Sequence, residues 1–271
     1  MIEEIGWGAA GTVFRAQHLK TRQLYAMKVL RPELKAEESV ISRFEAEYKA
    51  VQIVNHPNIV RVYDMGALED GRPFILMELM DKSLEATIAS DGALPFWRAI
   101  AIAQQVADAL TFVHEMGIIH NDLKTENLLL RRELGQDNIA KISDFGISRF
   151  REVVLAKARA KVTEGGFLIG TFNCMAPEQF MAEPPSERSD IWALGVTLYI
   201  MLTGENPFSG ESPMKTMFNI CNRNAVAPHK RRPDLNIPKA LSPVVSKALA
   251  KAPRDRFQNA VEFKSALGSL L

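Results

Sequence analysis

The spacing of hydrophobic residues divides the chain into a strand-rich first part and a helix-rich remainder. From residue 1 to 30, short apolar runs alternate with polar breaks: MIEEI, GWGAAG, TVFRAQHL, KTRQ and LYAMKVL. These runs are rich in β-branched and aromatic residues, which favours strands in hairpin order. Apolar residues recur at helical spacing over 37–54, which predicts a helix, and 58–80 predicts two further strands joined by the turn LEDGRP.

Beyond residue 83 the pattern changes to helices. The segment 83–90 predicts a short helix, and the apolar stripe of 95–117 predicts a long one that stops at Gly117. Residues 128–143 predict a small hairpin, and 189–208 are mostly apolar and predict a helix buried on all sides. This change of character places a structural boundary near residues 80–83.

Length and composition limit the classes of protein to consider. A chain of 271 residues suits two domains or one domain built in two lobes, and its 47% apolar and 24% charged residues are ordinary globular values. A net charge of +1 provides no general attraction for nucleic acid or an anionic membrane. Two cysteines, Cys174 and Cys221, are too few for a disulfide framework, and no apolar run approaches the roughly 20 residues that span a bilayer. We therefore expect a cytoplasmic domain, which can be part of a longer protein.

The most distinctive stretch is HNDLKTENLLL, which is followed downstream by KISDFG. The first segment contains Asp122 and Asn127, and the second contains Asp144. An ionised carboxylate costs several kcal/mol to bury unless it is paired, so acids that flank apolar segments usually face a cation. The cation that this set suggests is magnesium.

These residues resemble the catalytic loop and DFG signature of eukaryotic-like (Hanks-type) serine/threonine protein kinases, and the style of the sequence is similar to bacterial members. The family pattern is H-R-D-L-x-x-x-N followed by D-F-G. Further landmarks occur in the family's order from Gly6 to Arg256, so the resemblance covers essentially the whole chain. It implies an α+β, bilobal protein-kinase fold. The small antiparallel N-lobe with its helix C would span 1–80, the hinge about 78–83, and the larger helical C-lobe 84–271.

Gly6, Gly8 and Gly11 spell G-x-G-x-x-G, which alone is weak evidence because the dinucleotide-binding fingerprint has the same spelling. A dinucleotide fold would begin a helix directly after Gly11, whereas TVFRAQHL continues as a strand. We therefore favour a glycine-rich lid whose backbone N–H groups approach the phosphates of ATP.

The resemblance also implies the remaining nucleotide contacts. Lys28 would anchor the α- and β-phosphates and form an ion pair with Glu47, with Glu45 as the alternative. A lysine at a strand edge with a snorkelling stem is the structural alternative for Lys28. Met77 would be the gatekeeper, and Glu78 to Met80 would form the hinge that holds adenine through its backbone. The other implied contacts are Ile5, Val13, Ala26 and Leu129.

The implied catalytic set lies in the two acidic segments. Asp122 would orient the substrate hydroxyl and accept its proton, and Lys124 would stabilise the γ-phosphoryl charge. Asn127 and Asp144 would hold one or two Mg²⁺ ions, with Mn²⁺ as a substitute. The residue types of Lys124 and Thr171 are more similar to the pattern of serine/threonine kinases than to that of tyrosine kinases. The implied activity is transfer of the γ-phosphoryl group of ATP to Ser or Thr of protein substrates. The alternatives are a pseudokinase scaffold or an ATP-binding regulatory module without turnover and, more weakly, a small-molecule kinase.

The run from Ile147 to Cys174 resembles the activation segment, with Thr163 as the best candidate phosphorylation site. A solvated, charged loop is the alternative interpretation of its basic centre. Asn121 stands where the family has an arginine, which clamps a phosphorylated residue of this segment through a bidentate contact that asparagine cannot make. We hypothesise that activity depends less on activation-segment phosphorylation than in arginine-bearing relatives.

The triplet Ala176-Pro177-Glu178 matches the family's A-P-E. By resemblance, the expected partner of Glu178 is Arg256, in the stretch KAPRDRF, and Arg254 is the alternative. A buried pair of this kind is strongly destabilising to break, because one charge is left buried without its counterion.

Overall fold

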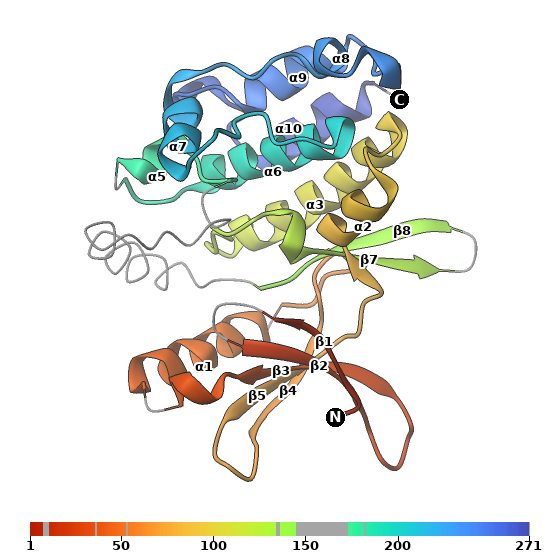
Figure 1. Cartoon of the computed structure of the whole chain (residues 1–271), viewed down its shortest axis with the longest axis vertical. Helices are drawn as coiled ribbons and strands as arrows, with labels where there is room; N and C mark the ends of the chain where they lie inside the picture. The colour runs from red at the N-terminus through yellow and green to blue at the C-terminus, as the bar shows by residue number, and fades with distance from the viewer. Residues whose placement is uncertain are drawn as a thin grey trace.

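The computed structural model describes most of the chain, namely residues 1–7, 11–35, 37–52, 54–133, 136–144, 173–181 and 183–270. Figure 1 shows a twisted sheet with one helix beside it at one end of the molecule and a group of helices at the other. A second, smaller sheet lies between them. The α+β, two-lobed architecture expected from the sequence is confirmed.

The N-terminal sheet has five antiparallel strands in the order β1-β2-β3-β5-β4. Its strands are β1 (Glu3–Trp7), β2 (Gly11–Gln17), β3 (Leu24–Leu30), β4 (Val62–Ala67) and β5 (Pro73–Met77). The two predicted hairpin regions are therefore confirmed. The order places β3 at the centre, where alternate residues face the helix that packs on this sheet and the sheet's other side.

Helix α1 (Glu38–Gln52) packs on this sheet through β4 and β5, after the short 3₁₀ helix η1 (Pro32–Leu34). Val40 and Phe44, one turn apart on α1, are buried against Leu30 of β3 and Ile75 of β5. The helical spacing of its apolar residues predicted α1 for this reason: one stripe of the helix covers the sheet.

Gly11 at the start of β2 has a packing role as well as its place in the glycine motif. A Cβ atom at this position would lie 2.7 Å from the carbonyl oxygen of Val29 on the neighbouring strand β3. A side chain at residue 11 would therefore push β2 and β3 apart. At Gly6, by contrast, a Cβ atom would meet nothing within 4 Å, so the space there is open.

The second sheet has three strands in the order β6-β7-β8 and connects the two lobes. Its strands are β6 (Lys82–Ser83), β7 (Leu128–Glu133) and β8 (Gln136–Ile142). The predicted hairpin over 128–143 is confirmed as β7 and β8, which pair in antiparallel fashion. The 3₁₀ helix η2 (Thr125–Asn127) directly precedes β7, so the hairpin begins where the catalytic-loop motif ends.

The remaining helices build the C-lobe. They are α2 (Leu84–Asp91), α3 (Phe96–Glu115), α5 (Pro177–Phe180), α6 (Glu187–Thr203), α7 (Pro213–Asn222), α8 (Pro228–Arg231), α9 (Leu241–Ala248), α10 (Ala260–Gly268) and the 3₁₀ helices η3 (Pro233–Leu235) and η4 (Pro253–Asp255). Local signals explain several boundaries. The Ser83 side chain accepts a hydrogen bond from the N–H of Ala86 and caps α2, and Gly117 follows α3 with a φ of 73°. None of the helices within the described ranges is long and apolar enough to cross a membrane.

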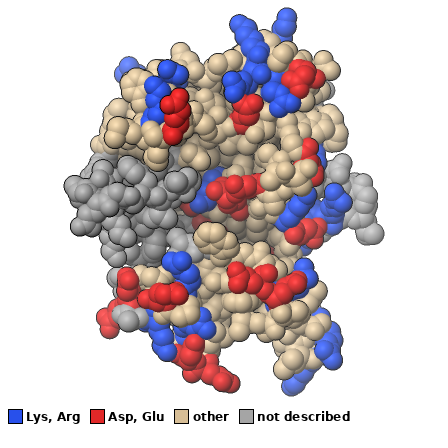
Figure 2. All heavy atoms as spheres, viewed as in Figure 1, with Lys and Arg blue, Asp and Glu red and all other residues tan. Residues whose placement is uncertain are grey.

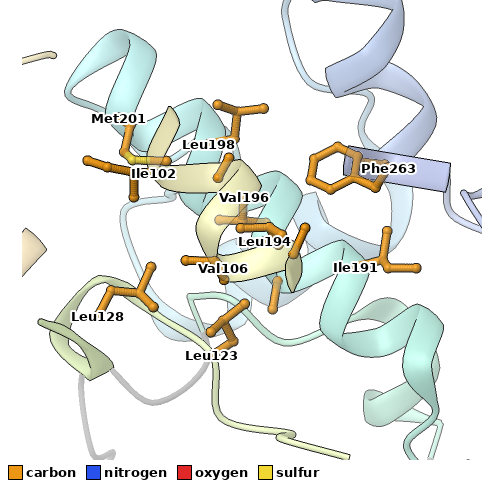
Figure 3. Close-up of a cluster of buried hydrophobic side chains, with 14 of the residues drawn as sticks. Ile102, Val106, Leu123, Leu128, Ile191, Leu194, Val196, Leu198, Met201 and Phe263 are labelled. Atoms are coloured by element: carbon orange, nitrogen blue, oxygen red, sulfur yellow. The ribbon is translucent and has the colours of Figure 1, made fainter. Parts of the chain in front are cut away.

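Helix α6 forms the centre of the C-lobe, and Figure 3 shows how the catalytic loop is attached to it. Apolar side chains of α3 and α6, including Val106 and Leu194, pack around Leu123, within the catalytic loop, and Leu128, directly after it. All four of these side chains are at most 2% exposed. The loop is thus attached to the buried core of the C-lobe at Leu123 and Leu128, which limits the movement of the polar residues beside them.

Candidate active site

The catalytic loop is held in place by one buried carboxylate at the start of α6. Asp190, which is 1% exposed, accepts hydrogen bonds from the backbone N–H groups of His120 and Asn121, each at 2.8 Å. It also lies 2.9 Å from Nε2 of His114 on α3. The sequence predicted a mostly apolar, buried helix here, with Asp190 at the start of a D-x-W-x-x-G pattern that resembles the kinase family, and the structure adds the hydrogen bonds that Asp190 accepts.

The loop brings Asp122 and Asn127 into direct contact. The Asn127 side-chain nitrogen donates to the backbone oxygen of Asp122 at 2.8 Å and to its carboxylate Oδ2 at 3.1 Å. Lys124 Nζ lies 3.4 Å from the same carboxylate oxygen. These three predicted residues therefore form one cluster, in which an amide and an ammonium group orient the Asp122 carboxylate.

Asp144 reaches this cluster from the end of β8. The N–H of Ser143, the preceding residue, donates to the backbone oxygen of Asn127 at 2.9 Å, which joins the two segments. Asp144 Oδ1 lies 2.5 Å from Nζ of Lys28, a residue of β3 that is 8% exposed. The pair connects the N-terminal sheet to the catalytic loop region. Lys28 is therefore not an isolated lysine at a strand edge, which was the structural alternative for this residue.

Two residues of the site have a left-handed backbone conformation. The φ angle is 59° at Asn121 and 56° at Asp144. This region is uncommon for residues other than glycine, and asparagine and aspartate occupy it more readily than most because their short polar side chains bond locally. Such conformations concentrate at functional sites, where the surrounding structure holds them.

The residues present fit a magnesium ion. Magnesium prefers oxygen ligands and is usually bound by one or two carboxylates together with substrate phosphates. The Asn127 nitrogen is committed to Asp122, and within the described part of the chain the Asn127 side-chain oxygen accepts no hydrogen bond. This oxygen and the Asp144 carboxylate are both oxygen ligands of the kind that magnesium prefers.

Strand register places the predicted nucleotide contacts of the N-lobe together. Gly6 is opposite Val13, and Val13 is opposite Lys28, so these residues form one row across three strands. Directly opposed residues of an antiparallel sheet share a face. Ala26, two residues before Lys28, lies on the same face and pairs with Met77 at the end of β5.

The other predicted contacts lie around this row. Ile5, next to Gly6 on β1, is 41% exposed. Leu129 on β7 pairs with Ser83, at the connection between the lobes. Met80 is 8% exposed, and within the described ranges its backbone N–H has no hydrogen-bond partner, which leaves that group open to a ligand.

Glu78 has a structural role that the sequence analysis did not foresee. Its carboxylate is bound by Arg131 Nη1 at 2.5 Å and by Lys141 Nζ at 2.8 Å, from β7 and β8. Burial alone would raise the pKa of Glu78, but its contacts with Lys141, Arg61 and Arg131 hold this pKa below the usual value. The side chain thus ties the connection between the lobes to the β7–β8 hairpin.

Several predicted residues fall outside the described part of the chain. These are Gly8, Thr163, Thr171 and the residues Phe145 and Gly146 that follow Asp144. The side chain of Glu47 is also outside it, although α1 includes the residue. The predicted Lys28–Glu47 ion pair therefore stays a prediction.

The predicted pairing of Glu178 with Arg256 is confirmed. Arg256 Nη1 and Nη2 donate to the two carboxylate oxygens of Glu178 at 2.7 and 2.6 Å, and Ser189 Oγ adds a third contact at 2.9 Å. Both residues are buried, at 5% and 1% exposure. Arg254, the alternative, has an 88% exposed side chain. Helix α5 is thereby fixed to the C-terminal part of the lobe.

A cavity of about 280 Å³ lies directly beside the catalytic loop. Asp122, Lys124 and Glu126 line one side, Ile88 of α2 lines another, and Gln179 of α5 closes a third. Figure 2 shows acidic side chains gathered near the middle of the visible face, with basic side chains next to them. This cavity gives a second molecule access to the Asp122 carboxylate.

Comparison with known proteins agrees with this geometry. Residues 1–266 match the model of the protein kinase domain. The chain is 36% identical over 264 residues to serine/threonine-protein kinase pkn3 of Myxococcus xanthus, covering 97% of this chain and 48% of that protein. It is 38% identical over 269 residues to PknB of Mycolicibacterium smegmatis, covering 98% of this chain and 41% of that protein. This chain thus spans less than half the length of these two curated relatives.

Solved structures show the same fold. Rad53 in complex with AMP-PNP superposes with a TM-score of 0.78 at 25% identity, covering 98% of this chain and 63% of that one. A double mutant of the Mycobacterium tuberculosis PknI kinase domain gives 0.71 at 28% identity, covering 98% and 93%. Taken together with the site, these matches show that the chain belongs to the protein kinase domain family and that its relatives include bacterial serine/threonine-protein kinases.

Proposed function

We propose that this chain transfers the γ-phosphoryl group of ATP to serine or threonine hydroxyls of protein substrates. Asp122 accepts the proton of the substrate hydroxyl while the oxygen of that hydroxyl forms a bond to the γ-phosphorus. The bond from this phosphorus to the β–γ bridging oxygen breaks, and ADP leaves. Lys124 stabilises the negative charge that spreads over the γ-phosphoryl oxygens.

The nucleotide is held from both lobes. Lys28 binds its α- and β-phosphates, and Gly6, Gly8 and Gly11 cover them. Met77, Glu78 and Met80 form the adenine hinge, with Ile5, Val13, Ala26 and Leu129 around the base. Asn127 and Asp144 hold magnesium, which neutralises phosphate charge when bound. Thr171 and Glu47 support the catalytic aspartate and Lys28, respectively.

The observation that carries this proposal is the meeting of Lys28, Asp122, Asn127 and Asp144 from separate segments. The contacts that join them are the 2.5 Å Lys28–Asp144 ion pair and the 2.8 Å hydrogen bond from Asn127 to Asp122. Phosphoryl transfer asks a protein mainly for positioning and charge neutralisation, and this set supplies cations, metal ligands and a base in one place.

We also propose that the lobe boundary lies in the hinge at about 78–83, with the N-lobe over 1–80 and the C-lobe over 84–271. We further propose a cytoplasmic location for this domain. The relatives are more than twice as long as this chain, so the assignment of this activity to a whole protein is likewise part of the proposal.

The test is transfer of label from γ-³²P-ATP to a generic acceptor protein, with Asp122→Asn beside the parent. We expect kcat to fall by about 10²–10⁴-fold in this variant, the usual effect of losing a general base. Asp255→Asn, which changes an exposed aspartate far from the cluster, is the matched control. If parent and Asp122→Asn bind ATP but label the acceptor equally poorly, the chain is a scaffold or an ATP-binding regulatory module.

Asp144→Asn separates the metal ligand from the base. Removing one carboxylate ligand should raise the Mg²⁺ concentration needed for half-maximal activity or nucleotide binding, whereas Asp122→Asn should leave it nearly unchanged. Titration of nucleotide binding with Mg²⁺ measures this without requiring turnover. Equal Mg²⁺ dependence in Asp144→Asn and the parent would contradict the assignment of Asp144 as a metal ligand.

A further inference from the structure

A side-chain hydrogen bond joins the catalytic loop to helix α5. The Gln179 side-chain nitrogen donates to Oδ1 of Asn121 at 2.5 Å. Asn121 is 7% exposed and directly precedes Asp122. Gln179 directly follows Glu178 of the A-P-E triplet. The contact thus connects the proposed base to a segment 58 residues away in the sequence.

Gln179 is fixed from its own side. Its side-chain oxygen accepts a hydrogen bond from the N–H of Ala176 at 2.8 Å, so both ends of the amide are used. The adjacent Glu178 is held by Arg256 and Ser189, which ties α5 to the rest of the C-lobe. The nitrogen of Gln179 is therefore presented to Asn121 by a helix that is itself anchored.

Asn121 offers the Gln179 nitrogen an acceptor that an arginine side chain lacks. Its N–H donates to Asp190 at 2.8 Å while its backbone adopts a φ of 59°, and in this position its side chain reaches α5. The contact needs an acceptor opposite the Gln179 nitrogen. Arginine has only donors, whereas asparagine has a carbonyl oxygen. The departure from the family pattern at this residue thus has a specific partner.

Both residues also line the cavity beside the base. Asn121, Asp122 and Gln179 all face the same space of about 280 Å³. A substrate segment that enters it would contact α5 and the catalytic loop together. We infer that the Asn121–Gln179 hydrogen bond is a positioning device, which couples the substrate-facing helix α5 to the orientation of Asp122. This inference rests on the proposed phosphotransferase function.

The experiment is a double-mutant cycle on kcat for peptide phosphorylation. Asn121→Gly removes the amide and accepts the positive φ without strain, and Gln179→Met keeps the length of the side chain without its donor. We expect each single variant to lower kcat about tenfold relative to the parent. The double variant should also be only about tenfold slower than the parent. The KM for ATP should stay within about twofold, because neither residue is among the proposed nucleotide contacts.

Asn219→Ala is the structural control. Asn219 is equally buried, at 6%, and its amide binds the backbone oxygens of Phe208 and Ser209 in another part of the C-lobe. We expect a lower melting temperature with kcat within about twofold of the parent. Arginine at 121 provides a further variant: Asn121→Arg should be as slow as Asn121→Gly in unphosphorylated protein.

Each outcome decides the inference. Independent effects that multiply to about a hundredfold in the double variant, or single variants that lower only the melting temperature, would overturn it. If Asn121→Gly fails to fold, Gln179→Met alone is decisive, since an unchanged kcat contradicts the coupling. A parent that transfers no phosphate overturns the proposed function, whereas an active parent with unaffected variants overturns only the positioning role.

Discussion

Lys28 and Asp144 form an ion pair of 2.5 Å that joins the central strand of the N-terminal sheet to the end of β8. The lysine side chain is 10% exposed and the aspartate side chain 38% exposed, so the pair lies at the edge of solvent. The pair brings the ammonium group proposed to bind phosphate next to the carboxylate proposed to bind the metal ion. A contact between the two lobes is thus formed by groups that are proposed to bind the nucleotide and its metal ion.

Lys28→Met should lower kcat/KM for phosphorylation by about 10²–10³-fold, because one preorganised charge that faces the phosphates is lost. Steady-state kinetics at saturating Mg²⁺ measure this effect. Lys264→Met is the control, since Lys264 pairs at 2.6 Å with Asp108 on the surface of the C-lobe. A Lys28→Met enzyme within tenfold of the parent would contradict the role assigned to this lysine.

Arg256→Met should lower the free energy of unfolding by about 3–5 kcal/mol, since the Glu178 carboxylate stays buried without its counterion. Urea unfolding followed by circular dichroism measures the change. Arg254→Met, at the exposed position two residues earlier, should change stability by less than about 0.5 kcal/mol. Similar losses in both variants would mean that the buried pair is not the source of the effect.

The same pair predicts how stability depends on acid. Burial alone would raise the pKa of Glu178, but the hydrogen bonds and charge of Arg256 outweigh it and hold this pKa below its usual value of 4.5. A carboxylate with a depressed folded-state pKa contributes stability above the unfolded pKa and loses it as pH falls through the folded one. The stability advantage of the parent over Glu178→Gln should therefore be constant above about pH 5.5 and shrink below pH 4.5. Urea unfolding measured at pH values from about 3 to 7, about one pH unit apart, tests this dependence. A stability advantage that stays constant over this range would contradict it.

Thr163→Ala should change kcat/KM by less than about tenfold. Asn121 cannot form the bidentate phosphate contact of an arginine, and its side chain is already bonded to Gln179. The comparison requires parent enzyme whose phosphorylation state has been determined by mass spectrometry. A drop of about a hundredfold, or about 2.7 kcal/mol of barrier, would contradict the hypothesis.

The sequence by itself determined the elements and the inventory of chemical groups. Hydrophobic periodicity predicted the hairpins of the N-lobe, helix α1 and the buried α6, because each depends on a local repeat of side chains. The order of the motifs around Asp122, Asn127 and Asp144 indicated the family, because spacing within a motif is a property of the chain alone, and the resemblance then implied the partner of Glu178.

Only the tertiary structure decided which groups meet. Asp190 holds the catalytic loop across 69 residues of sequence, and Glu78 is bound by Lys141 across 63. The Asn121 side chain, at the position where the family has an arginine, forms a hydrogen bond with Gln179. Partners so distant in the sequence leave no periodic signal. The packing of the lobes and helices decides which polar side chains pair. The sequence therefore named the reactive groups, and packing fixed their orientation.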